Sequence, residues 1–216
     1  MRTYNRIQWL GMLTGLAAFP MLAWGQNFNL SPTFAGHAVA LQVTQLGDDP
    51  AVLAETGPAP ANGGQRENSL RDTPPIPGID AHMLYAATFG AGSRNHSQAS
   101  LAFLDVKLGS HHVTALWVES EATATAEFLK VPTSGKSTLQ GLTVDGQLVT
   151  VTGEANQTIT FPDGFLIINE QSGLSTQHFG TLTVNALRLL VDGAGSITAA
   201  SSTAEVINAP TPNSEP

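Results

Sequence analysis

The segment from Ser137 to Val191 constrains the fold most, because its turn residues are spaced as in a series of β-hairpins. Asp145-Gly146 lies between two runs of branched residues, and a two-residue turn of this kind needs the positive φ that glycine adopts freely. Pro162-Asp163-Gly164 and Asp192-Gly193 provide similar breaks between later apolar runs. Proline and glycine in such positions end one strand and allow the next to begin. We therefore predict an antiparallel meander over 137–191.

Further segments alternate between apolar or small residues and polar ones, as expected of strands with one buried face. The longest runs from His112 to Phe128, with its even positions predicted to be buried and to include an alanine ladder at Ala122, Ala124 and Ala126. The alanine content would also suit a helix over 121–128, but the interleaved threonines favour a strand. The other predicted strands cover residues 35–44, 82–89, 99–108 and 196–207.

These strands and turns recur at the spacing typical of two packed sheets. We predict an all-β, antiparallel, jelly-roll-like sandwich of about ten strands, preceded by a signal-peptide helix. Residues 26–208 are expected to form this single domain, and residues 209–216 a disordered polar tail. Residues 48–79 are rich in proline and glycine and poor in branched apolar residues. They are predicted to be one long surface loop and the first place to look for a binding site.

The first 25 residues have the parts of a secretory leader. Arg2 and Arg6 precede a short apolar run, and the small residues Ala23 and Gly25 stand where a signal peptidase cleaves. The apolar run is shorter than the ~20 residues that a membrane span needs, and Pro20 interrupts it. We expect cleavage after Gly25, with no membrane contact afterwards and a location in the periplasm, at the cell surface or outside the cell.

The charge and the cysteine content narrow the classes of partner. Of nine basic residues two lie in the predicted leader, so the remaining chain has seven against 17 acidic residues, a net charge of −10. Such a surface repels phosphate backbones, which disfavours nucleic-acid binding. The chain has no cysteine, which excludes disulfides and thiolate metal sites.

The candidate functional site consists of polar residues that lie in otherwise apolar or threonine-rich strands. Asn156, Asn169 and Asn185 are predicted to form a structural network, because a buried amide needs partners at both of its ends. The alternative is a ligand site in which Asn169, Glu170, Gln171 and Asn185 present oxygens to a sugar hydroxyl or to Ca²⁺. Calcium takes about six to eight oxygen ligands, more than these residues supply, so the sequence predicts no metal and no cofactor.

Several segments resemble the choice-of-anchor P family of exported bacterial proteins, whose members share a β-rich domain and differ in how, or whether, they are attached to the cell surface. The resemblance is most specific over Leu139–Leu189, implies export from a bacterial cell, and implies no particular activity. Residues 209–216 contain no recognisable sorting tail, which favours release or retention in the periplasm. The segments that carry the resemblance are Gly36–Val43, Val118–Ala126, Leu142–Gly146, Gly153–Thr158, Ile168–Gln171 and Thr183–Arg188.

Two kinds of covalent chemistry would use acidic residues or a lysine that the chain contains. A polysaccharide hydrolase would need a facing pair of carboxylates, for which Glu119, Glu121 and Glu170 are candidates; on the outward side of a strand, however, Glu119 and Glu121 suit a solvated acidic face. An intramolecular amide bond would need Lys107 opposite Asn185, with Glu170 beside them. No Gly-x-Ser-x-Gly elbow is present for a serine nucleophile.

Histidines do not group into a metal site. His111 and His112 are adjacent at the start of a strand, so their rings are expected on opposite faces and cannot chelate one ion together. His37, His82, His96 and His178 are scattered along the chain. Surface positions are therefore expected for them.

The sequence as a whole predicts a non-catalytic β-domain that acts in adhesion, ligand binding or extracellular structure. A glycan or an envelope protein is the expected partner. One alternative is a subunit that self-associates through an edge strand, with Gln26–Val43 as the donated strand. The other alternative is the polysaccharide-acting hydrolase.

Overall fold

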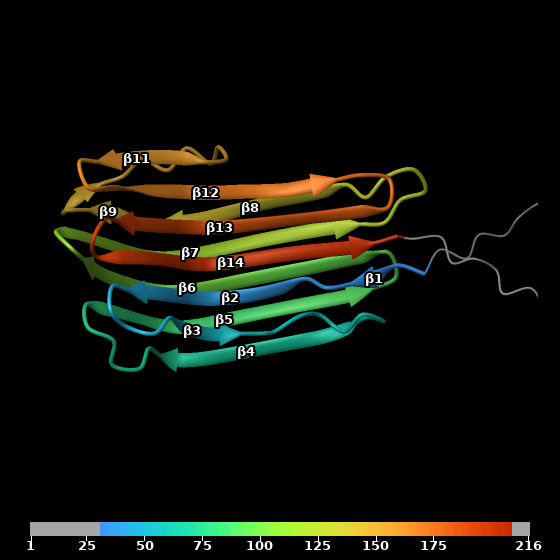
Figure 1. Ribbon diagram of the computed structural model, residues 1–216, viewed down its shortest axis with the longest axis horizontal. Coiled ribbons are helices and arrows are strands. Elements are labelled where there is room, and N and C mark those ends of the chain that lie inside the picture. Colours follow the sequence, from blue (N-terminus) through green and yellow to red (C-terminus); the bar gives the residue numbers. More distant parts are fainter. Residues whose placement is uncertain (1–30, 209–216) are drawn as a thin grey trace, which may run out of the picture.

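The computed structural model describes residues 31–208, which form two antiparallel sheets packed face to face (Figure 1). The predicted all-β sandwich is confirmed, with fourteen strands in the described residues where about ten were expected. The predicted signal-peptide helix over 1–25 and the predicted tail over 209–216 lie outside the described residues. Within 31–208 there is no helix long and apolar enough to cross a membrane.

Each sheet contains seven strands. The first sheet has the order β11-β12-β13-β14-β2-β3, with β1 beside β14, and the second has the order β10-β9-β7-β6-β5-β4, with β8 beside β7. The strands of the first sheet are β1 (Thr33–Phe34), β2 (His37–Gln45), β3 (Ala51–Glu55), β11 (Gln157–Phe161), β12 (Gly164–Ser175), β13 (Phe179–Val191) and β14 (Gly195–Ile207). The strands of the second sheet are β4 (Gly64–Asp72), β5 (Ile79–Ala91), β6 (Arg94–Leu108), β7 (His111–Thr125), β8 (Thr133–Gln140), β9 (Thr143–Val144) and β10 (Gln147–Leu148).

The chain changes sheet between β3 and β4 and again between β10 and β11. The meander predicted over 137–191 is therefore wrong as one unit, because β8, β9 and β10 belong to the second sheet and β11, β12 and β13 to the first. Val149 and Val151 pack against the core where the chain crosses. Within each sheet most neighbours are joined by hairpins, so the connections differ from the Greek keys of a jelly roll.

The Asp-Gly turns form as predicted. Asp145 and Gly146 have φ values of 50° and 76° and join Val144 to its partner Gln147, which is the two-residue hairpin that this pair favours. Pro162 and Asp163 likewise separate Phe161 from its partner Gly164.

The prediction of one long loop over 48–79 is wrong, because this segment contains two edge strands. β3 pairs with β2 at one edge of the first sheet, and β4 pairs with β5 at the edge of the second. The prolines lie in the connections around these strands, where they interrupt no pairing, and Gly64 begins β4 opposite Gly90. The segment Gln26–Val43, predicted as a donated strand, is also largely used within the fold: β1 pairs with β14, and β2 lies between β14 and β3.

At one common level, the strands of the first sheet change phase, which means that the alternation of inward and outward residues shifts by one position. In β13, the buried residues Leu182, Val184 and Ala186 are followed by the buried Leu187 and Leu189, so that two consecutive residues face the core. The same change occurs on the neighbouring strands without loss of register. The residues that form the row at this level, on five neighbouring strands, are Asn169, Ala186, Ala200, Ala40 and Ala54. On every second strand the residue in this row has a left-handed φ of 52–54°, namely Asn169, Ala200 and Ala54.

The alanine ladder of β7 is confirmed at Ala122 and Ala124, but the predicted strand to Phe128 is too long, because β7 ends at Thr125 and Phe128 is 76% exposed. Ala122 and Ala124 are fully buried, where small side chains let the facing sheet approach. In the first half the prediction is wrong, since Val113 and Ala115 are buried while Leu116 is exposed. β7 is a strand up to Thr125, so the alternative helix over 121–128 is absent.

Hydrogen bonds between the sheets lie inside this apolar core. Ser120 Oγ and Ser202 Oγ are 2.7 Å apart, and both residues are fully buried. Asn95 Oδ1 accepts a bond of 2.9 Å from the backbone N–H of Glu205. Because unpaired buried polar groups are costly, these contacts specify how the sheets align.

Candidate functional site

The predicted polar residues divide between the two faces of the first sheet. On the inner face, Asn169 Nδ2 donates to the carbonyl of Gly153 at 3.1 Å, and Asn169 Oδ1 accepts from Gln171 Nε2 at 3.0 Å. Asn156 Oδ1 accepts from the backbone N–H of Gln171 at 2.9 Å. These bonds hold the crossing segment 149–156 against β12, which is the structural role predicted for Asn156 and Asn169.

Asn185 lies on the outer face, apart from that network. Its Nδ2 donates to Glu170 Oε2 at 2.6 Å, and Arg188 Nη1 lies 2.9 Å from Glu170 Oε1. The single three-asparagine network and the ligand site formed by Asn169, Glu170, Gln171 and Asn185 are therefore wrong as groupings. A sheet separates Asn169 and Gln171 from Glu170 and Asn185, so no sugar or Ca²⁺ could contact all four.

The residues proposed for covalent chemistry are also kept apart. Glu119 and Glu121 project from the outer face of the second sheet, whereas Glu170 projects from the outer face of the first. Lys107 is exposed on the second sheet, on the side of the sandwich away from Asn185. Neither the three-carboxylate hydrolase site nor the Lys–Asn bond is assembled in the described residues.

His111 joins the two sheets at the end of the sandwich opposite the termini. Its Nδ1 lies 2.9 Å from Asp145 Oδ2, in the β9–β10 turn, and its Nε2 lies 2.8 Å from Asp163 Oδ1, in the β11–β12 turn. The ring stacks on Phe161 with centroids 4.0 Å apart. As predicted, His112 does not share these contacts: its Nε2 is 3.0 Å from Asp105 Oδ1.

The hydrogen bonds in this cluster shift the pKa values of His111, Asp145 and Asp163. Hydrogen bonds to Asp163 and Asp145 raise the pKa of His111. The pKa of Asp145 is lowered first by the backbone N–H of His112 and then by His111, and the pKa of Asp163 is lowered chiefly by His111. Two ionised carboxylates can only accept hydrogen bonds, so both ring nitrogens must donate and the imidazolium form fits this site.

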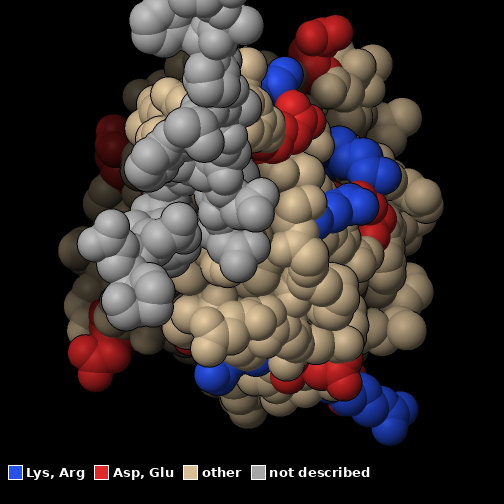
Figure 2. All heavy atoms as spheres, turned by 90° about the vertical axis from the view of Figure 1, so that its right-hand side faces the viewer, with Lys and Arg blue, Asp and Glu red and all other residues tan. Residues whose placement is uncertain are grey.

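Aspartates gather at this end of the sandwich, which we call the turn end. All eight aspartates of the sequence lie in its turns or near the strand ends that lead to them. At the opposite end, basic and acidic side chains are interspersed (Figure 2). No three histidine or acidic side chains within 31–208 are placed to hold a metal ion. The eight aspartates are Asp48, Asp49, Asp72, Asp80, Asp105, Asp145, Asp163 and Asp192.

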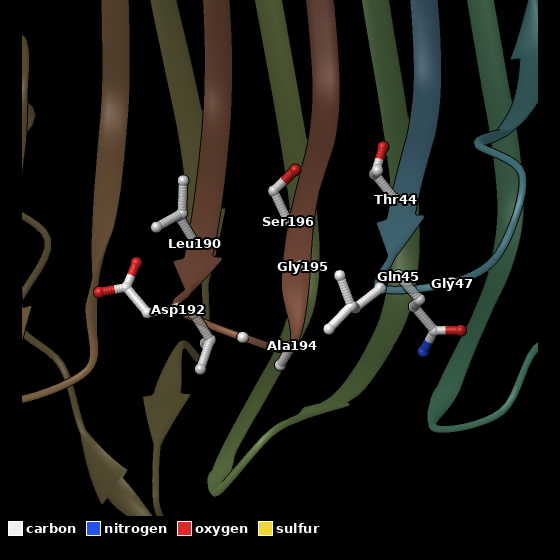
Figure 3. Close-up of a pocket in the computed structure, with 11 residues that line it drawn as sticks. Thr44, Gln45, Gly47, Leu190, Asp192, Ala194, Gly195 and Ser196 are labelled. Atoms are coloured by element: carbon white, nitrogen blue, oxygen red, sulfur yellow. The ribbon is translucent and has the colours of Figure 1, made fainter.

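A depression of about 340 Å³ opens at the turn end, between the β13–β14 turn and the end of β2. Figure 3 shows that Leu190, Ser196, Thr44 and Gln45 stand around it on three neighbouring strands, with Asp192 in the β13–β14 turn. Their polar atoms do not point toward one centre. The depression thus lacks the convergent polar groups that orient a bound small molecule.

An aromatic and apolar band crosses the outer face of the second sheet. Met83 on β5, Phe103 on β6 and Leu116 on β7 are 61%, 57% and 59% exposed. Met83 and Phe103 have φ values of 53° and 51°. At this level the strands change phase, so that two consecutive residues, such as Leu116 and Trp117, both face outward. We call Met83, Phe103, Leu116 and Trp117 the outer band.

Polar side chains with fixed positions border the outer band. Glu119 accepts bonds from Gln98 Nε2 at 2.5 Å and from Trp117 Nε1 at 3.3 Å. On the other side, the ring of His82 meets Phe103 edge-on at 6.2 Å and its Nδ1 lies 2.7 Å from Asp72 Oδ1. Apolar surface with oriented donors and acceptors beside it is the usual composition of a recognition site.

Sequence reasoning missed the outer band, because period-two alternation places Leu116 in the core. Left-handed residues within a strand are usually glycine or asparagine, and neither Met83 nor Phe103 carries that signal. The one trace in the sequence is Leu116-Trp117, two large apolar residues in succession, which cannot both face inward on a regular strand.

Comparison with protein-family models, curated proteins and solved structures found no match for this chain.

Proposed function

We propose that this protein is an exported, non-catalytic binding module that holds an extended, uncharged polysaccharide against the outer band. The observation that carries the proposal is the band itself: Met83, Phe103 and Leu116 are exposed side by side on rigid, paired strands. Large apolar side chains exposed together mark interaction sites more often than single exposed ones do.

The shape of the band favours a polymer chain over a globular protein. It forms a row across β5, β6 and β7, whereas a stable protein interface buries about 800 Å² per partner and involves some 20–30 residues on each side. A single chain of sugar rings needs only a narrow strip. Rings laid along the row would place their apolar faces on Phe103 and Trp117.

The polar border of the band suits hydroxyl groups. Gln98 and Glu119 on one side of the apolar row and His82 on the other supply donors and acceptors, and their own hydrogen bonds fix their orientation. A preorganised group loses less entropy on binding than a mobile one does.

The charge of the chain favours an uncharged polysaccharide. Beyond residue 25 the net charge is −10, and Asp72 and Glu119 lie beside the band. An acidic polysaccharide would be repelled.

Affinity electrophoresis tests the proposal. The chain from Gln26 onward would be run through native gels containing the neutral polymers β-glucan, galactomannan or dextran, with alginate as an acidic polymer. We expect retardation by a neutral polymer and none by alginate. Phe103→Ala and Leu116→Ala should each weaken retardation by about fivefold or more, because truncating a residue that contributes substantially to binding costs more than ~1 kcal/mol.

Matched control variants separate the band from apolar surface in general. Phe89→Ala removes a phenylalanine exposed to 47% on β5, and Leu174→Ala removes a leucine exposed to 55% on β12 of the other sheet. Both should retain full retardation. Retardation by alginate alone, or equal losses in band and control variants, would refute the proposal.

A further inference from the structure

The free edge of β4 is the longest uncovered strand edge among the described residues. β4 pairs only with β5, and all nine of its residues are exposed. The edge of β8 is partly covered, since Gln171 Nε2 donates to the carbonyl of Gly135 at 3.3 Å. Unpaired N–H and C=O groups along such an edge can accept another strand.

We propose that β4 pairs with β4 of a second copy of this chain, antiparallel and centred on Ser69. In this register Ser69 faces its own counterpart, and Glu67 faces Arg71 of the second copy on both sides of the twofold axis. The outer faces of the two sheets become continuous. The interface is closed and isologous, as in most homodimers.

The charges of β4 select this register among the close alternatives. Centring the pair on Glu67 would place two glutamates face to face, which is destabilising. Centring it on Asn68 or on Leu70 leaves Glu67 opposite a serine or a threonine, without a cation. Among these registers, which keep the outer faces of the two sheets continuous, only the Ser69-centred one gives both Glu67 side chains a basic partner.

The side chains involved are available and point to one face. Ser69 and Glu67 lie opposite Tyr85 and Ala87 of β5, and alternate with the inward Asn68, whose Nδ2 donates to the carbonyl of Glu55. Arg71 is 93% exposed, and its nearest charged partner is Asp72 at 3.8 Å. Charged edges usually prevent strand pairing; here the same charges are complementary to a second copy.

Dimerisation would place two outer bands on one continuous face. Each band lies at the level of Arg71, which is two residues from the axis at Ser69. A polymer that reaches both bands would be bound with higher avidity than either band alone provides. Formation of the dimer, however, requires only the β4 edge and does not depend on which ligand the outer bands bind.

Cysteine cross-linking tests the register directly, because the chain has no cysteine of its own. In Ser69→Cys the two introduced side chains would face each other across the axis, with Cα atoms about 4.5–5.5 Å apart, within the range of about 4.4–6.8 Å that a disulfide spans. We expect a covalent dimer under mild oxidation. Gln65→Cys, on the same face of the same strand, should remain monomeric because its counterpart would lie about eight residues away along the strand, or ~26 Å.

Charge exchange supplies a second, independent readout by sedimentation equilibrium. Glu67→Arg alone and Arg71→Glu alone would each set like charges opposite one another and weaken dimerisation by about tenfold or more, whereas the double exchange should restore it. Lys130→Glu, at the opposite end of the sandwich, should have no effect. A wild-type chain that stays monomeric at high concentration, cross-linking through Gln65→Cys as readily as through Ser69→Cys, or single exchanges that still dimerise would overturn the proposal.

Discussion

Single residues decide which side chains reach the surface of this sandwich. Asn169 has a φ of 54° inside a strand, and asparagine tolerates this region better than most residues do. Ala54, Ala200, Met83 and Phe103 adopt it without that advantage. Each such residue costs of order 1 kcal/mol, and the surrounding ladders supply the stability that holds it there.

Replacement of Asn169 by alanine should destabilise the fold by about 2 kcal/mol, since it removes two buried hydrogen bonds and the tolerance for positive φ. Asn185→Ala is the matched control. Asn185 bonds Glu170 on the outer face, so its loss should cost less than about 1 kcal/mol. Urea unfolding of both variants measures the difference, and equal losses would contradict the division of the polar residues between two faces.

His111 should make the stability of the turn end depend on pH. Its pKa is raised from 6.5, so its contribution is complete below that value and is lost as the pH rises through the higher pKa of the folded state. The pKa values of Asp145 and Asp163 are lowered from 3.8, so their contribution is present above 3.8 and is lost as the pH falls through the lower folded values.

Comparison of the wild type with His111→Gln should therefore show the largest difference in unfolding free energy between these limits, at about pH 5, and a smaller one at about pH 9. Urea midpoints measured across this range provide the test. A difference that stays constant with pH would show that His111 contributes by packing on Phe161 alone.

For the strands and turns, the sequence predicts local features such as turn positions. It does not predict where a strand shifts the alternation of residues that face the core and residues that face solvent. The Asp145-Gly146 turn and the strands around it follow from φ preferences and alternation, both of which are local. The change of sheet after β10 and the phase change at Leu116 depend on contacts with neighbouring strands. Asn95 shows the same limit: it lies between the predicted strands 82–89 and 99–108, yet it belongs to β6, is buried and is bonded across the sandwich.

The candidate site was predicted less well than the fold for the same reason. Asn156 and Asn169 were recognised as structural because polar residues in apolar strands need partners. Glu170 is predicted to share a site with Asn169 and Gln171 because the three are consecutive, although consecutive strand residues face opposite ways. Asn185 is predicted to join them because it is another amide in an apolar strand, a pattern that does not tell which face it occupies. The outer band follows from left-handed residues that no sequence pattern marks.

Replacement of Ala124 by leucine tests the close approach of the sheets at β7. Ala124 is fully buried, and added methylenes in a packed core cost about 1–3 kcal/mol. Thr125→Leu, on the outward side of the same strand, should change the unfolding free energy by less than about 0.5 kcal/mol. A tolerated Ala124→Leu would mean that the sheets separate easily at this point.

At the scale of the whole molecule, the two ends of the sandwich differ. The described chain begins and ends at one end (Figure 1), where Thr33 pairs with Ile207. The aspartates lie in the turns and near the strand ends at the other end. The outer band occupies a side face between them. Ligand contact at the band therefore leaves both ends free, and the acidic turn end discourages polyanions from approaching the same molecule.

Trp117 fluorescence reports polymer binding at the outer band, because Trp117 is the one tryptophan beyond residue 25 and belongs to this band. The chain from Gln26 onward would be titrated with the neutral polymer that retards it most, β-glucan, galactomannan or dextran. We predict a saturable change in emission, with a midpoint at about fivefold or more higher polymer concentration in Phe103→Ala and an unchanged midpoint in Phe89→Ala. Binding that leaves the emission of Trp117 unchanged, or a midpoint that Phe89→Ala shifts as far as Phe103→Ala does, would show that the polymer does not bind at the outer band.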